Sequence, residues 1–183
     1  MNIKLIALVF LAFVLASCNG QSTDKSEEVI DFEQTRFNTA SLLQHVEVLS
    51  SDALEGRRTG TASSLKAKDY IIAQLKILQV KPLTESYEQQ FSFKNKEKSY
   101  QGINVLGKIE GSERPDKYIV ISAHYDHEGI KNGKIYNGAD DDASGISALF
   151  AFAEYFQKNP PKHSVILAAF DAEELGLQGS RYF

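Results

Sequence analysis

The chain has 183 residues, with 20 basic and 24 acidic side chains and a formal net charge of −4 at pH 7. This length suits about one domain, and an apolar fraction of 43% is enough for a hydrophobic core. The slight acidic excess argues against nucleic acid as a partner. The sequence contains 1 cysteine, which excludes a disulfide within the chain.

The first residues predict a signal peptide. An early lysine precedes an apolar run over residues 5–14, which is too short to cross a bilayer. The following LASC, residues 15–18, resembles a bacterial lipobox, which implies removal of residues 1–17 and lipidation of Cys18. An ordinary secretory signal with a chance cysteine is the alternative. We expect a protein anchored in the membrane of the cell envelope by a lipid on Cys18.

A polar segment follows, from Asn19 to Glu28, and predicts a flexible tether. We therefore divide the chain into a signal peptide (1–17), a tether (18–36) and a folded part (37–183). Because Asn19 rather than an acidic residue follows the cysteine, we expect the outer membrane or the periplasmic face.

The first half of the folded part predicts two helices and two strands. Apolar residues recur at helical spacing over Asn38 to Asp52 and over Ser63 to Leu78. The glycine-containing LEGRRTG, Leu54 to Gly60, separates these helices. Ser86 to Phe93 and Ile103 to Ile109 are typical of strands, the first of them exposed.

The second half predicts a strand–helix–strand unit. KYIVISAH, Lys117 to His124, is nearly all apolar and predicts a strand buried on both faces. Ser144 to Lys158 predicts a helix that ends before Pro160-Pro161, and His163 to Asp171 predicts a second buried strand. This order predicts an α/β fold with a largely parallel sheet.

Polar side chains cluster where these elements meet the expected edge of the sheet. In open α/β sheets, sites form at the carboxyl ends of the strands. A mixed set of imidazole and carboxylate groups suits zinc or a similar divalent ion. The residues are, in chain order, His124, Asp126 and His127; Asp140, Asp141 and Asp142; and Asp171, Glu173 and Glu174.

Each of these segments has a simpler interpretation when it is taken alone. A His-x-Asp pair is usually a surface pair, a Glu-Glu pair suits the start of a helix, and aspartates cap helices. The run from Asp140 to Gly145 also begins like a calcium-binding EF-hand loop. That loop needs a glutamate at its twelfth position, where Ala151 stands inside an apolar helix, so we exclude it.

Taken together, SAHYDH, NGADDDASG and AAFDAEELGLQGS resemble the three successive signatures of metallopeptidase family twenty-eight, a family of di-zinc exopeptidases. The resemblance extends over Leu54 to Phe183. It implies a three-layer zinc-exopeptidase fold with a mostly parallel central sheet, of which residues 37–183 would be the N-terminal part.

The resemblance also implies a role for individual residues. His124 resembles a ligand of one zinc ion, and Asp126 the carboxylate that orients this imidazole. Asp140 resembles the carboxylate that bridges two zinc ions. Glu173 resembles the general base and Glu174 a ligand of the other zinc ion. These roles predict that His124, Asp140 and Glu174 lie together.

The resemblance predicts a cis peptide bond between Asp140 and Asp141, and it leaves Asp141 and Asp142 to support the turn and the start of the helix. The family also needs a further aspartate and histidine downstream of the Glu-Glu pair, whereas this sequence ends at Phe183. We therefore expect the chain to be the N-terminal portion of a longer enzyme and to be inactive by itself.

The function that these features favour is hydrolysis of peptides by an aminopeptidase with two zinc ions. Two alternatives stay open. A glutaminyl cyclase has a similar fold but uses one zinc ion, and a non-catalytic binding lipoprotein would keep the fold without the metals.

Overall fold

The computed structural model describes residues 37–183. The predicted signal peptide and tether, including Cys18, lie outside this range, so these predictions stay predictions. Within residues 37–183, no helix combines the length and the apolar character that crossing a membrane requires.

All of the predicted helices and strands are present, with additional short elements between them. The helices are α2 (Thr39–Leu49), α3 (Ala62–Ile77), α4 (Ser144–Lys158) and α5 (Gln178–Tyr182), with a 3-10 turn at Asp52–Leu54 and a π-type turn at Ala139–Ala143. The strands are β1 (Lys81–Pro82), β2 (Glu88–Asn95), β3 (Lys98–Ile109), β4 (Arg114–His124), β5 (Gly129–Lys131), β6 (Lys134–Tyr136) and β7 (His163–Phe170).

Side-chain caps start the first two helices. The side chain of Asn38 accepts a hydrogen bond from the backbone N–H of Ser41 at 3.1 Å, at the start of α2. Thr61 does the same for the N–H of Ser64 at 3.2 Å, at the start of α3. Such caps satisfy N–H groups that have no partner inside the helix.

The sheet is mixed rather than mostly parallel, which corrects the sequence-based expectation. The strand order is β1-β3-β7-β4, and β2 also pairs with β3. Within residues 37–183, β4 and β7 are the only parallel pair of this sheet, as predicted for the strand–helix–strand unit. The other pairs are antiparallel. For β2 and β3 the reason is local, because a tight turn joins them and forces the two strands to run in opposite directions.

β7 is buried along its length, as predicted, because it lies between β3 and β4. The prediction that β4 is buried on both faces is wrong. In β4, Tyr118, Ile119 and Val120 are 54%, 51% and 45% exposed. β4 pairs with β7 along one edge, and no described strand covers its other edge.

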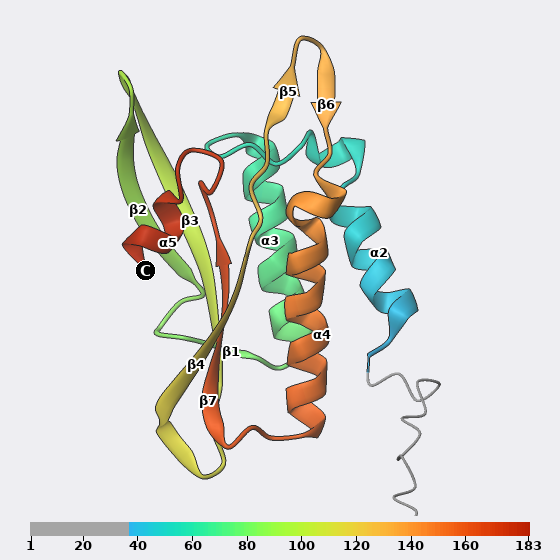
Figure 1. Ribbon diagram of the computed structural model, residues 1–183, viewed down its shortest axis with the longest axis vertical. Coiled ribbons are helices and arrows are strands. Elements are labelled where there is room, and N and C mark those ends of the chain that lie inside the picture. Colours follow the sequence, from blue (N-terminus) through green and yellow to red (C-terminus); the bar gives the residue numbers. More distant parts are fainter. Residues whose placement is uncertain (1–36) are drawn as a thin grey trace, which may run out of the picture. The chain divides into compact units, whose positions relative to one another are not determined.

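Helices lie on both faces of the sheet (Figure 1), which confirms the predicted α/β architecture. α2, α3 and α4 lie on one side, where Val105 of β3 packs in the hydrophobic core with residues of α3 and α4. The neighbouring Asn104 points the other way and donates a hydrogen bond to the backbone carbonyl of Gly179 in α5 at 2.9 Å. Because neighbouring side chains of a strand point to opposite faces, α5 covers the second face.

Candidate metal centre

The three polar segments meet at one end of the sheet. In the parallel register His124 at the end of β4 lies opposite Phe170 at the end of β7. Figure 1 shows both strands running toward the end of the sheet at which α4 begins. The segments 124–127, 139–143 and 171–174 therefore come together where open α/β sheets place their sites.

The carboxylate of Asp141 lies at the centre of this cluster. One of its oxygens, Oδ1, is 2.9 Å from Nε2 of His124, and the other, Oδ2, is 3.8 Å from Nδ1 of His127. Nδ1 of His127 is in turn 2.7 Å from Oε1 of Glu174. Ligand atoms of His127, Asp141 and Glu174 all lie within 4.8 Å of one another.

The structure puts Asp141 rather than Asp140 in this place, so the predicted position is corrected by one residue. Asp140 is exposed, and its backbone carbonyl accepts a hydrogen bond from the Ser144 hydroxyl at 2.9 Å. The prediction of a cis peptide bond between Asp140 and Asp141 is also wrong by one residue. The cis bond of the structure joins Asp141 to Asp142. Three identical side chains in a row give the sequence no means of showing which one the turn directs into the cluster.

Asp142 supports the turn and the start of the helix, as predicted. Its Oδ1 accepts a hydrogen bond from the N–H of Gly145 at 2.9 Å, and its Oδ2 accepts one from the N–H of His124 at 3.2 Å. A Cβ at Gly145 would lie 2.3 Å from Oδ1 of Asp142, so a glycine is needed here. Asp142 thus joins the first turn of α4 to the end of β4.

Asp126 lies beneath the cluster and is 0% exposed. Its carboxylate accepts hydrogen bonds from the N–H groups of Glu173 at 2.9 Å and Glu174 at 3.3 Å. Its backbone carbonyl is 3.0 Å from Nδ1 of His124, and its Oδ1 is 3.7 Å from the same nitrogen. This geometry suits the orienting role that the resemblance implies, and it also fixes the segment that carries both glutamates.

Glu173 and His124 line a common open pocket. The pocket has a volume of about 270 Å³ and is also lined by Ser122, Ala123, Asp142, Phe170, Leu177 and Ser180. Glu173 is half-buried. It therefore lies beside the cluster without belonging to the His127, Asp141 and Glu174 group.

Two residues of LEGRRTG position the cluster, which the sequence analysis missed. Thr59 Oγ1 lies 3.1 Å from Oδ2 of Asp126 and 2.9 Å from Oδ1 of Asp171. Arg57, which is 1% exposed, donates hydrogen bonds to the backbone carbonyls of Tyr125 at 2.8 Å, Gly138 at 2.9 Å, Asn137 at 2.6 Å and Leu49. The sequence gives little indication that Arg57 is buried, because arginine side chains are usually exposed.

The charges of the cluster shift the pKa values of several groups. Burial lowers the pKa of His124, but the nearby carboxylates of Asp126 and Asp142 outweigh this effect and raise it to about 9. Burial raises the pKa of Glu174. Burial also lowers the pKa of Arg57 to about 10, against the opposing effect of the aspartates. Arg57 thus keeps its positive charge at neutral pH beneath the acidic cluster.

The donor set fits a divalent cation. One imidazole nitrogen and two carboxylates are ligands that zinc accepts. Among the described residues, the buried Nδ1 of His127 and Oε1 of Glu174 have no hydrogen-bond partner. They are 2.7 Å apart, but their orientation is not that of a hydrogen bond. A cation bound to both atoms would give each of them a partner.

Comparisons with known proteins agree with this interpretation. Residues 104–183 match Peptidase family M28. The chain is 41% identical over 83 residues to a "Probable zinc metalloprotease" of Pyrenophora tritici-repentis, a match that covers 43% of this chain and 17% of that protein.

Two solved structures illustrate the similar fold. A Zn-dependent exopeptidase from Parabacteroides distasonis is 25% identical, with a TM-score of 0.62, and the match covers 75% of this chain and 47% of that one. A Porphyromonas gingivalis glutaminyl cyclase, 22% identical with a TM-score of 0.66, matches 81% of this chain and 53% of that one. The chain thus spans about half of these structures.

The predicted resemblance is confirmed by the matched residues, which contain all three motifs and every member of the cluster. Residues 104–183 of this chain match Peptidase family M28, to which the chain is similar over this segment.

Proposed function

We propose that the protein is a zinc-dependent exopeptidase and, within that class, an aminopeptidase. The observation that carries the proposal is Asp141, whose two carboxylate oxygens face His124 on one side and His127 with Glu174 on the other. A carboxylate with this arrangement suits two metal positions that share one ligand. The zinc metalloprotease name of a relative supports the hydrolase class.

In this proposal His124, Asp141 and Glu174 hold the metal ions. Bound zinc polarises the carbonyl of a peptide and lowers the pKa of a bound water. Glu173, which lies on the same segment as Glu174, is the general base that accepts a proton from the attacking water and gives it to the leaving amine. Asp126 keeps both glutamates in place through their N–H groups.

A glutaminyl cyclase is the second candidate, because several solved structures of similar fold carry that name. These cyclases are at most 22% identical to this chain and therefore support the fold alone. Glutaminyl cyclisation forms a ring within an N-terminal glutamine and needs no attacking water. The motif AEELGLQGS and the shared position of Asp141 favour the peptidase.

We further propose that the protein works in the cell envelope, held by a lipid on Cys18. The motivation is the LASC sequence directly after the apolar run. Mass spectrometry of membrane-extracted protein tests this proposal. The N-terminal peptide expected begins at Cys18 and carries a diacylglyceryl group, and an unmodified Cys18 would overturn the anchor.

Three substrates and a chelator distinguish the candidate functions. The full-length protein should be incubated with aminoacyl-chromophores, acyl-blocked peptides and glutaminyl peptides. We expect it to release the chromophore, to lose this activity with chelator and to recover it with zinc. Ring closure of glutaminyl peptides without hydrolysis would favour the cyclase, and metal binding without turnover would favour a binding protein.

A further inference from the structure

We propose that His127 is a metal ligand, so that His127, Asp141 and Glu174 form a three-ligand site from residues of this chain alone. The inference deepens the proposed function and rests on its assignment of a metal to Asp141 and Glu174. The sequence resemblance gave no role to His127.

The distances place His127 on the opposite side of Asp141 from His124. Nδ1 of His127 is 2.7 Å from Oε1 of Glu174 and 3.8 Å from Oδ2 of Asp141. His124 instead faces Oδ1 of Asp141, at 2.9 Å. The two histidines therefore belong to two different metal positions that share Asp141.

Burial makes the pairing of His127 with Glu174 costly unless a cation is bound. The side chains of His127 and Glu174 are 12% and 19% exposed. Within the described part of the chain, neither Nδ1 of His127 nor Oε1 of Glu174 has a hydrogen-bond partner. A buried polar atom without a partner destabilises the fold, and a shared cation would give a partner to both atoms.

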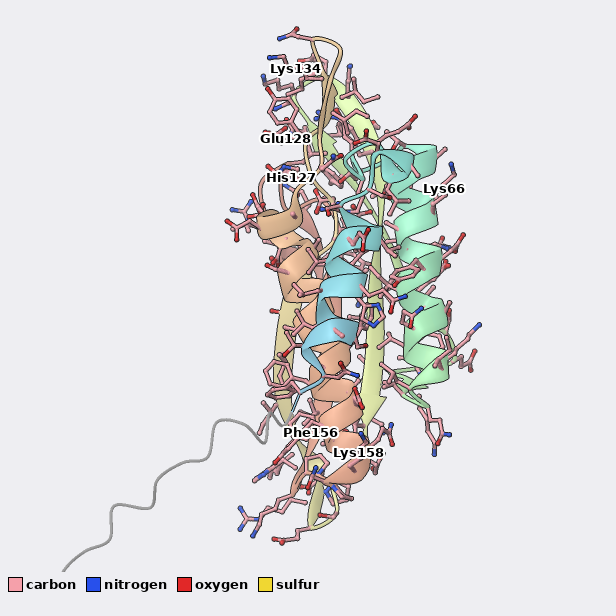
Figure 2. All side chains as sticks on the ribbon, turned by 90° about the vertical axis from the view of Figure 1, so that its right-hand side faces the viewer. Lys66, His127, Glu128, Lys134, Phe156 and Lys158 are labelled. Atoms are coloured by element: carbon pink, nitrogen blue, oxygen red, sulfur yellow. The ribbon has the colours of Figure 1, made fainter. Side chains whose placement is uncertain are left out.

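The neighbouring residues are arranged so that His127 reaches the cluster. A Cβ at Gly138 would lie 2.6 Å from Cγ of the His127 ring, so the ring occupies space that only a glycine leaves free. Figure 2 shows His127 at the base of the β5–β6 hairpin and Lys134 nearer to its tip. The adjacent Glu128 is paired with Arg58 and Lys131 instead.

The chemistry of the site suits zinc or cobalt. Catalytic zinc commonly has three protein ligands and one open position for water or substrate. One imidazole and two carboxylates supply three such ligands here.

Metal titration of the purified chain tests the proposal. Zinc and cobalt(II) should be titrated into the wild-type protein, into His127→Gln and into His163→Gln. His163 is the matched control, because it begins β7 at the end opposite to the cluster. We expect His127→Gln to weaken binding at least about tenfold, since even the loss of a residue that only supports a ligand costs that much. His163→Gln should bind as the wild type does.

His127→Cys separates a ligand from a residue that only shapes the loop. A thiolate bound to cobalt(II) gives a charge-transfer band in the near ultraviolet, which the wild-type protein should lack although it contains Cys18. Appearance of this band would identify position 127 as a ligand. Circular dichroism of each variant would report folding.

The outcomes distinguish this inference from the proposed function. If the wild-type chain binds neither metal, both are overturned. If it binds metal and the His127 variants bind equally well without the new band, only the inference about His127 is overturned.

Discussion

Asp140, Asp141 and Asp142 are chemically identical, yet the turn between Gly138 and α4 gives each a different neighbour. Asp140 faces solvent and offers its backbone carbonyl to Ser144. Asp141 faces the two histidines, and Asp142 accepts hydrogen bonds from the backbone of β4 and α4. Substitution of each aspartate by asparagine therefore affects a different property of the protein.

Asp141→Asn should lose metal binding, whereas Asp140→Asn should not. The first substitution removes a charge that lies within 4 Å of His124 and His127, and the second changes a carboxylate outside this cluster. We expect zinc affinity, measured by isothermal titration calorimetry, to fall at least about 100-fold in Asp141→Asn, since it alters a ligand rather than a supporting residue. Equal affinities in the two variants would contradict the assignment of Asp141.

Glu173→Gln should abolish turnover and leave the metal bound. A general base contributes about 10²–10⁴-fold to the rate, and glutamine keeps the shape of the side chain without its basicity. The control is Glu154→Gln, an exposed change on α4 where Glu154 pairs with Lys158. Zinc content and kcat should be measured in the full-length protein. A near-normal kcat in Glu173→Gln would remove Glu173 from the mechanism.

The buried carboxyl of Asp171 should make stability depend on pH. Burial raises the pKa of Asp171 from 3.8 to about 6. The folded state therefore holds a proton that the unfolded state has lost between these pH values, and stability falls as the pH rises through this window. Two pKa units correspond to about 3 kcal/mol, an order of magnitude for this loss.

Asp171→Asn tests this dependence. The N–H groups of Ile103 and Ala172 both donate to the carboxylate, and the single amide oxygen of asparagine cannot replace both carboxylate oxygens. The variant is therefore less stable than the wild type, and its own stability lacks the pH dependence that Asp171 causes. Urea unfolding from pH 4 to pH 7 should show that the gap between wild type and variant narrows as the pH rises. A constant gap would mean that Asp171 has an ordinary pKa.

At the scale of secondary structure, local patterns predicted the helices and strands but not the order and direction of the strands in the sheet. Helical spacing located α3, and an apolar run located β7. The same apolar character predicted that β4 is buried, whereas strand order makes it an edge of the sheet. Strand order and direction depend on contacts between distant segments, which a period of two or 3.6 residues does not encode.

The sequence likewise predicted a part of the candidate site. The motifs identified His124, Asp126, Glu173 and Glu174, and the structure brings their segments together at one end of the sheet. The choice among three aspartates and the part played by His127 depend on the path of one turn. Arg57 acts through backbone carbonyls, which have no sequence signature at all.

Arg57→Met should destabilise the fold by about 3–5 kcal/mol, as expected for breaking a buried charged network. Its guanidinium joins the end of α2, the end of β4 and the loop before the acidic turn. Removing it leaves four carbonyls without this donor. Arg58→Met is the control, because Arg58 has a 37% exposed side chain. Urea denaturation should show a large loss for the first variant and a small change for the second.

On the scale of the whole molecule, the acidic cluster is a source of repulsion that a cation relieves. The carboxylates of Asp126, Asp141, Asp142 and Glu174 lie close together, and Arg57 is the buried positive group beneath them. A divalent ion would add positive charge where the ligand atoms converge. Metal binding and folding should therefore be linked.

Zinc should raise the melting temperature of the chain, and a chelator should reverse the effect. A ligand that binds only the folded state at about 100 times its Kd stabilises it by about 2.7 kcal/mol. For a domain of this size, that corresponds to a rise of roughly 5–10 °C. Differential scanning calorimetry of the wild-type chain and of Asp141→Asn, each with zinc and with EDTA, measures both effects.

The variant provides the decisive comparison, because zinc also binds weakly to unfolded chains and to surface groups. Such binding would act on the wild type and on Asp141→Asn alike, whereas binding at the cluster would act on the wild type alone. Asp140→Asn should keep the full rise, since its carboxylate lies outside the cluster. An equal rise in all three proteins would place the zinc elsewhere and leave the acidic turn as a structural feature of the fold.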